Sequence, residues 1–105
     1  MDAQLKRGVL EACVLSALVK DRSYGYQIIK SLAPVVKISE STLYPILKRL
    51  ETSGYLAAQS LEHNGRLRKY YAITGIGRER LTQFIAEWEG IADIYQYIQN
   101  EVAKL

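Results

Sequence analysis

An unbroken heptad pattern near the C-terminal end of the chain constrains the fold more than any other feature of the sequence. Apolar residues recur there at steps of three and four for over three heptads. The members of this series are Leu81, Phe84, Trp88, Ile91, Tyr95, Ile98, Val102 and Leu105. A helix over residues 75–105 would be about 45 Å long at 1.5 Å per residue. Such a helix overhangs so small a domain, so we expect a second copy of the chain to cover its apolar seam.

Two shorter helices are predicted at the N-terminal end. Residues 5–19 are apolar around almost the whole circumference of a helix, so two of its sides must be covered, and we expect a partner subunit to cover the second. Residues 24–32 carry apolar side chains at helical spacing, with Ser23 as a candidate N-cap. Pro34 is expected to end this second helix.

A third helix is expected to begin at Ser39 or Ser41, each of which is a candidate N-cap. Gly54 stands where a left-handed C-terminal cap belongs. The buried stripe of this helix comprises Leu43, Ile46, Leu47 and Leu50. Pro45 conflicts with the pattern because proline removes a helical hydrogen bond. We expect an irregular first turn in an otherwise intact helix.

Residues 55–61 and 67–73 are predicted to form a two-stranded wing. They flank Asn64 and Gly65, and an Asn-Gly pair between two strand-like runs is a strong hairpin signal. Basic residues lie at the tip and on the return strand: Arg66, Arg68 and Lys69. Neighbouring residues of a strand alternate between faces, so at least one of the adjacent tyrosines at 70 and 71 is expected in the core.

The charge is divided between two parts of the chain. Residues 1–74 carry 11 Lys and Arg against 6 Asp and Glu, a net charge of +5, whereas residues 75–105 carry 3 against 5, a net charge of −2. A basic body with an acidic tail suits a module that meets a polyanion with one end and a protein with the other. The predicted fold is mainly α with a small β-hairpin: a winged helix-turn-helix over residues 1–74 and a long C-terminal dimerisation helix over residues 75–105.

The third helix and the wing supply the candidate DNA contacts. The outward side of that helix carries hydroxyls, a tyrosine and two cations, which approach phosphates and base edges without steric or charge conflict. The candidate DNA-binding residues are Ser41, Thr42, Tyr44, Lys48, Arg49, Asn64, Arg66, Arg68 and Lys69. An ordinary solvated helix face would show similar residue types, but the adjoining basic wing favours DNA.

Several classes of protein are disfavoured by what the sequence contains. Cys13 and His63 are the single cysteine and the single histidine, which excludes a disulfide framework or a Cys/His metal cluster within one chain. The sequence has no glycine-rich phosphate loop and no evident acid pair, so we expect neither enzymatic activity nor a cofactor. No apolar run approaches the roughly 18 residues that a membrane span needs. We therefore expect a cytoplasmic protein.

Several segments resemble the PadR-like transcriptional regulators. The most specific are residues 41–51 and 68–74, and residues 24–29 and 54–56 also match. The resemblance extends over nearly the whole chain. It implies a homodimeric winged-helix repressor whose third helix enters the major groove of double-stranded DNA. The single C-terminal helix resembles that of a smaller subfamily, which includes regulators of multidrug-efflux genes that bind flat aromatic compounds between their subunits.

The resemblance places that subfamily's dimer-pore tryptophan on Trp88. Two interpretations of this residue stay open. It is either a core aromatic side chain in the heptad seam or a plate on which a planar aromatic effector stacks. In the second case Ala92, one turn further along the same face, is small enough to leave space beside the ring.

The predicted dimer contacts combine the seam with the first helix. They are Leu10, Val14, Leu81, Phe84, Trp88, Ile91, Tyr95, Ile98 and Val102. The leading hypothesis is a repressor that binds a pseudo-palindromic operator as a homodimer and is released by a ligand. The alternative is a winged-helix protein-interaction module that does not bind DNA. The basic wing argues against that alternative.

Overall fold

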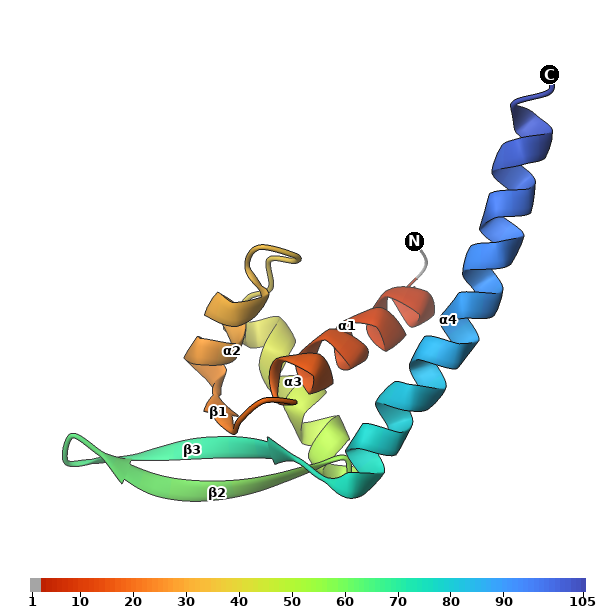
Figure 1. Cartoon of the computed structure of the whole chain (residues 1–105). Helices are drawn as coiled ribbons and strands as arrows, with labels where there is room; N and C mark the ends of the chain where they lie inside the picture. The colour runs from red at the N-terminus through yellow and green to blue at the C-terminus, as the bar shows by residue number, and fades with distance from the viewer. Residues whose placement is uncertain (1–2) are drawn as a thin grey trace.

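The computed structural model describes residues 3–105, with side chains from Leu5 onward. Along the chain the elements are α1 (Ala3–Ala17), β1 (Ser23–Tyr24), α2 (Gly25–Leu32), α3 (Glu40–Thr52), β2 (Leu56–His63), β3 (Arg66–Ile73) and α4 (Gly75–Val102). In Figure 1 the first three helices gather on one side of the sheet, and α4 rises past α1 and projects beyond the rest of the molecule. The predicted fold, a winged helix-turn-helix followed by a long C-terminal helix, is confirmed.

The core lies where α1, α2 and α3 meet one another and the base of the sheet. Among its most deeply buried side chains are Leu15, Leu18, Ile28, Leu43 and Leu47. Helix α1 packs against α2 and α3 and also against α4 of the same chain. The side of α1 that the sequence assigns to a partner subunit is therefore covered largely by the other helices of the same chain.

Two of the predicted dimer contacts have little surface left for a partner for this reason. Val14 has no exposed surface and Leu10 is only 7% exposed, so both belong to the core of one chain. An amphipathic pattern shows that a side chain is covered but cannot show which chain covers it. The part of α1 that stays partly exposed beside α4 contains Leu5 and Val9 instead.

Helix α3 is capped at both ends. The hydroxyl of Ser39 accepts a hydrogen bond from the Thr42 N–H at 3.3 Å, as expected of an N-cap. At the other end Gly54 adopts a φ of 82°, and its N–H donates to the Glu51 carbonyl at 3.0 Å. The next N–H, that of Tyr55, donates to Leu50, which completes a Schellman motif. The helix runs unbroken through Pro45.

Ser23 does not cap α2, contrary to the prediction. It lies in β1, where it pairs with Tyr71 of β3, and its hydroxyl donates to Gln27 Oε1 at 3.0 Å. The N-cap of α2 is Tyr24, which makes no side-chain cap hydrogen bond. This two-residue strand makes the sheet three-stranded, with the order β1-β3-β2. Pairing with a distant strand has overridden a local capping preference.

The wing is a regular antiparallel hairpin. Strands β2 and β3 pair from Leu56 opposite Ile73 to His63 opposite Arg66. Asn64 and Gly65 form the turn with φ values of 54° and 79°, as a type I′ turn requires. Tyr71 is buried in the core, and this confirms the expectation for the tyrosine pair.

Helix α4 begins where the sequence predicts. The Thr74 hydroxyl accepts a hydrogen bond from the Gly77 N–H at 3.0 Å and donates one to the Gly54 carbonyl at 2.7 Å, which ties α4 to the end of α3. Leu81 packs against the core. From residue 89 to the C-terminus every side chain is exposed. Among the helices of residues 3–105, none is long and apolar enough to cross a membrane.

Gly77→Ala is expected to destabilise the fold. A Cβ at this position would overlap the Tyr55 carbonyl and lie 2.8 Å from Ile73 Cγ1. Overpacking of this kind typically costs about 1–3 kcal/mol. We expect the midpoint of thermal unfolding, measured at one protein concentration, to fall by at least about 4 °C.

Gly75→Ala is the matched control for this substitution. Gly75 lies in the same first turn of α4, and no described atom lies within 4 Å of a Cβ built there. Because alanine is favoured over glycine in helices, this variant is expected to be neutral or slightly more stable. Equal midpoints for the two variants would contradict the close packing at Gly77.

Candidate DNA interface and dimer seam

The outward face of α3 is polar and accessible. Ser41, Pro45, Lys48 and Thr52 lie opposite the buried stripe of this helix, and all four are exposed. The face combines hydroxyl groups with one cation and contains no carboxylate. These are the groups that hydrogen-bond to base edges and phosphates. Thr42 is also exposed, next to the Ser39 cap.

One flank of α3 faces the wing across a groove of about 470 Å³. Three of the predicted DNA-binding residues line this groove: Tyr44, Arg68 and Lys69. Lys69 Nζ lies 3.7 Å from Glu51 Oε1 of α3, which ties the wing to the helix. The groove also contains Tyr71, and burial raises the pKa of its phenol, partly offset by Lys69. The groove therefore offers neutral hydroxyls and two cations to a single ligand.

Tyr44 packs against the start of α2. Its hydroxyl oxygen lies 2.7 Å from the position that a Cβ on Gly25 would occupy, so the ring packs directly over this glycine. Its side chain is still 48% exposed. The predicted base-contacting tyrosine therefore packs on α2 and keeps about half of its surface accessible.

Arg68 belongs to an aromatic stack on the sheet. Its guanidinium carbon lies 4.0 Å from the centre of the Tyr24 ring, which meets the Tyr70 ring edge-on at 5.6 Å. Arg22 lies 5.7 Å from the centre of that second ring. Such cation–π contacts fix the direction of a flexible arginine. Lys69, its neighbour in the strand, lies instead 5.6 Å from the centre of the Tyr71 ring and pairs with Glu51.

The tip of the wing is fully exposed. Asn64 forms the turn, and Arg66 and Leu67 follow it on the return strand. Leu67 is 79% exposed, an unusual position for a leucine. The structure thus places Asn64 and Arg66 at the tip, and Arg68 and Lys69 follow further along β3. DNA contact by all nine residues stays a prediction.

The second flank of α3 faces α1 across another groove, of about 460 Å³, which contains Arg49 and Lys48. Arg7 and Glu11 of α1 line its opposite side, and they form an ion pair of 3.3 Å. The sequence pattern does not predict this groove. The Arg7–Glu11 spacing of four residues is visible in the sequence, but only the fold brings this pair beside Arg49.

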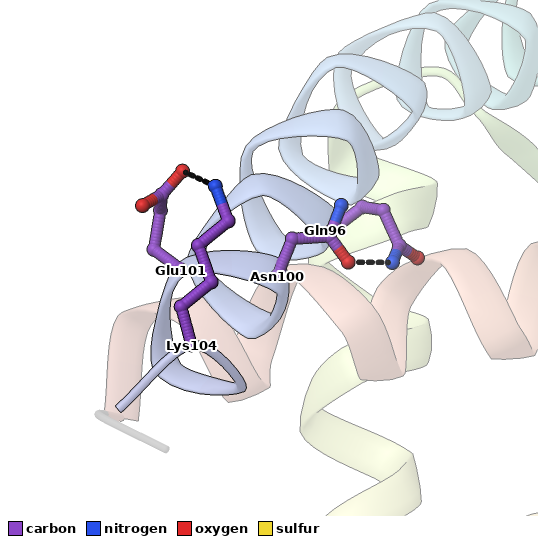
Figure 2. Close-up of polar contacts among 4 residues, drawn as sticks. All are labelled: Gln96, Asn100, Glu101 and Lys104. Carbon is purple, nitrogen blue, oxygen red and sulfur yellow. Dashed lines mark hydrogen bonds and ion pairs between the residues drawn. The ribbon is translucent and has the colours of Figure 1, made fainter.

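The apolar seam of α4 lies open in one chain. Ile91, Tyr95, Ile98 and Val102 are between 44% and 60% exposed. Clusters of large exposed apolar side chains on a soluble protein mark an interaction surface. Figure 2 shows two polar pairs near the end of α4, Gln96 with Asn100 and Glu101 with Lys104. Pairs at this spacing stabilise a helix only modestly, by about 0.2–0.5 kcal/mol each.

Trp88 lies beside a groove between α1 and α4 of about 380 Å³. Its ring packs against Phe84 with centres 5.5 Å apart. From α1 the groove is lined by Leu5, Gly8 and Val9. Ala92, predicted to leave space beside the ring, is exposed and lies outside this lining. The free space beside Trp88 is therefore bounded by α1.

The structure offers little to support metal or thiol chemistry. Among the described residues, no group of three or more His, Cys, Asp or Glu side chains is placed to hold a metal ion. Cys13 packs against the core, and burial raises the pKa of its thiol. A raised pKa disfavours the reactive thiolate.

Comparison with known proteins gives a consistent result. Residues 14–83 match the model of the transcriptional regulator PadR-like family. A PadR-family transcriptional regulator from Eggerthella lenta is 37% identical, with a TM-score of 0.82 over 91% of this chain and 86% of that one. A PadR-like transcription factor from Bacteroides fragilis is 34% identical, with a TM-score of 0.81 over 91% and 95%. A transcriptional regulator of Mycobacterium tuberculosis is 43% identical over 47 residues, 45% of this chain and 44% of that protein.

Proposed function

Because the chain belongs to the PadR-like family of transcriptional regulators, we propose that it represses transcription by binding a pseudo-palindromic DNA operator as a homodimer. A planar aromatic compound bound between the subunits releases the DNA. The protein acts in the cytoplasm and catalyses no reaction.

The outward face of α3 is the observation that carries the DNA-binding proposal. Lys48 and Thr52 lie exposed on this face, and Lys69 is held next to the helix by Glu51. An α-helix fits the major groove of B-DNA, which is about 12 Å wide. With α3 in that groove, the wing reaches the neighbouring backbone. Two such units related by a two-fold axis meet half-sites about one helical turn apart, or a multiple of it.

The effector proposal is supported by the groove beside Trp88. Apolar side chains line it on both helices, and Glu87 stands at its edge, 3.6 Å from Arg80. Aromatic faces bind flat ligands with little demand on hydrogen-bond pattern. A ligand that favoured one relative orientation of the subunits would change the spacing of the two α3 helices, and therefore the DNA affinity.

Selection of genomic fragments by the purified protein tests the DNA-binding proposal. We expect the protein to retain a small set of fragments that share a pseudo-palindrome. Lys48→Ala and Lys69→Ala should each weaken binding to the recovered operator and lower its salt slope by about one unit, because each removes a phosphate contact. Tyr44→Ala should also reduce the preference for the operator over random DNA.

Lys104→Ala is the control, since this exposed lysine lies at the far end of α4 beside Glu101. It should leave both affinity and salt slope unchanged. DNA affinity that is equal at low and high salt would contradict the proposal and favour a protein-interaction module.

A further inference from the structure

The groove between α1 and α3 has the chemistry of an anion site. Three cations line it, Arg7, Lys48 and Arg49, against one carboxylate, Glu11. The hydroxyl-bearing Thr52 and Ser53 complete the wall on the α3 side. The groove is therefore positively charged even with its carboxylate ionised, and it is rich in hydrogen-bond donors.

One of these donors lacks an acceptor. Arg49 Nε is buried, and among the residues that the structure describes it has no hydrogen-bond partner. An unsatisfied buried donor typically costs about 1–3 kcal/mol, so native proteins rarely keep one without a reason. A guanidinium pairs well with phosphate oxygens through two parallel N–H groups. Arg49 as a whole is only partly buried and lines the groove, so an anion there can reach its guanidinium, and a rotation of the side chain would turn Nε toward that anion.

We propose that this groove is a second DNA-backbone site, which holds a phosphate of the strand opposite the one met by the wing. The proposal rests on the DNA-binding function proposed above. Arg49 and Arg7 are the principal donors to this phosphate, and Lys48 lies between the groove and the bases. Backbone contacts then hold α3 on both of its flanks.

The geometry of α3 supports contact with two strands. Glu51, which pairs with Lys69 of the wing, is two residues from Arg49, so their side chains point about 200° apart around the helix. An α-helix with its side chains is about 10–12 Å wide, which nearly fills the major groove. One backbone therefore runs along each flank. The wing lies on the Glu51 flank and α1 on the Arg49 flank.

Glu11 gives the proposal a test of opposite sign. This carboxylate pairs with Arg7 Nε at 3.3 Å in the free protein and would repel a phosphate in the groove. Glu11→Gln should therefore strengthen DNA binding, on the order of fivefold at low salt. If Glu11 served only to stabilise the fold, this substitution would not increase the DNA affinity.

The experiment uses the full chain and the operator duplex recovered by fragment selection. Arg7→Gln and Arg49→Gln should each weaken binding, and Arg49→Gln should lower the salt slope by about one unit. Arg49→Lys should keep the slope but lose affinity, because the charge remains and the planar fork is gone. Lys6→Gln, on α1 but outside the groove lining, and Glu79→Gln on α4 are the matched controls and should change neither quantity.

Duplexes with a single neutral methylphosphonate then locate the contact. On the duplex whose neutral group replaces the phosphate that Arg49 contacts, Arg49→Gln should cause no further loss of affinity. The same test with Lys69→Gln should identify a phosphate on the opposite strand. If both variants identify phosphates on the same strand, the proposed second backbone site is wrong, but the DNA-binding function stands. The same holds if Arg49→Gln binds DNA like the wild type while Lys69→Gln binds more weakly. Wild-type protein that binds no operator at all would overturn the proposed function itself.

Discussion

Ile98→Asp is expected to convert the proposed dimer into monomers at micromolar concentration. Ile98 is 51% exposed in one chain and lies in the middle of the exposed seam. Burying an isoleucine side chain stabilises by about 1.5–3 kcal/mol, and a two-fold interface contains the residue twice. Because Ile98 is 51% exposed in one chain, each copy has about half of this to lose, so the lost apolar burial is about 1.5–3 kcal/mol, or roughly 10- to 150-fold in the dimer dissociation constant. An unpaired buried carboxylate adds to this cost.

Sedimentation velocity over a concentration series measures this effect. Ile76→Asp is the matched control, since Ile76 is 58% exposed on the same helix but lies outside the heptad series. It should remain dimeric with an unchanged dissociation constant. A well-folded wild-type monomer at micromolar concentration would rule out the seam as a dimer interface.

The features that the sequence predicted well are set by nearby residues. Asn64 and Gly65 adopt positive φ values because a two-residue hairpin requires them, and this rule needs no knowledge of the rest of the chain. The caps at Ser39, Gly54 and Thr74 follow from the same kind of local chemistry. The heptad spacing in α4 likewise depends only on helical periodicity.

The features that were missed depend on contacts between distant segments. Ser23 was predicted as a helix cap, but it lies in β1, where it pairs with Tyr71 of β3, far along the chain. Leu10 and Val14 were assigned to a second subunit because periodicity identifies a covered face without identifying its cover. The cationic groove arises for the same reason, since its residues come from two separate helices. In each case the missing information is which elements meet.

The aromatic stack of Arg68 limits what its replacement will show. The sequence groups Arg68 with Arg66 and Lys69 as interchangeable wing cations. In the structure Arg68 stacks on Tyr24, Lys69 pairs with Glu51, and Arg66 is exposed at the tip. A loss of DNA affinity in Arg68→Ala would therefore mix lost charge with a loosened sheet, whereas Arg66, exposed at the tip, reports on charge more directly.

Planar cationic aromatic dyes are expected to quench the fluorescence of Trp88 and to lower operator affinity. Trp88 is the single tryptophan, so its emission reports on this groove alone. The indole lies beside Phe84 with the apolar residues of α1 opposite, and the carboxylate of Glu87 at the edge is paired with Arg80, which also lines the groove. Stacking contributes about 0.5–1.5 kcal/mol per aromatic pair beyond the area buried. Trp88→Ala should abolish dye binding, measured by calorimetry, and largely preserve DNA binding.

Gly8→Leu tests the groove while keeping the tryptophan as the reporter. No described atom lies within 4 Å of a Cβ at Gly8, yet this residue lines the groove, so a leucine there should fill the ligand space without a clash inside one chain. We expect this variant to remain a folded dimer. Its dye affinity, measured by quenching, should fall at least tenfold, since a filled groove leaves the ligand no apolar surface to bury. Gly90→Ala, an equally open glycine on α4 outside the groove lining, should bind dyes as the wild type does. If the emission of Trp88 is blue-shifted and unaffected by every dye and by operator DNA, the tryptophan is a packed residue of the dimer seam and the effector proposal fails.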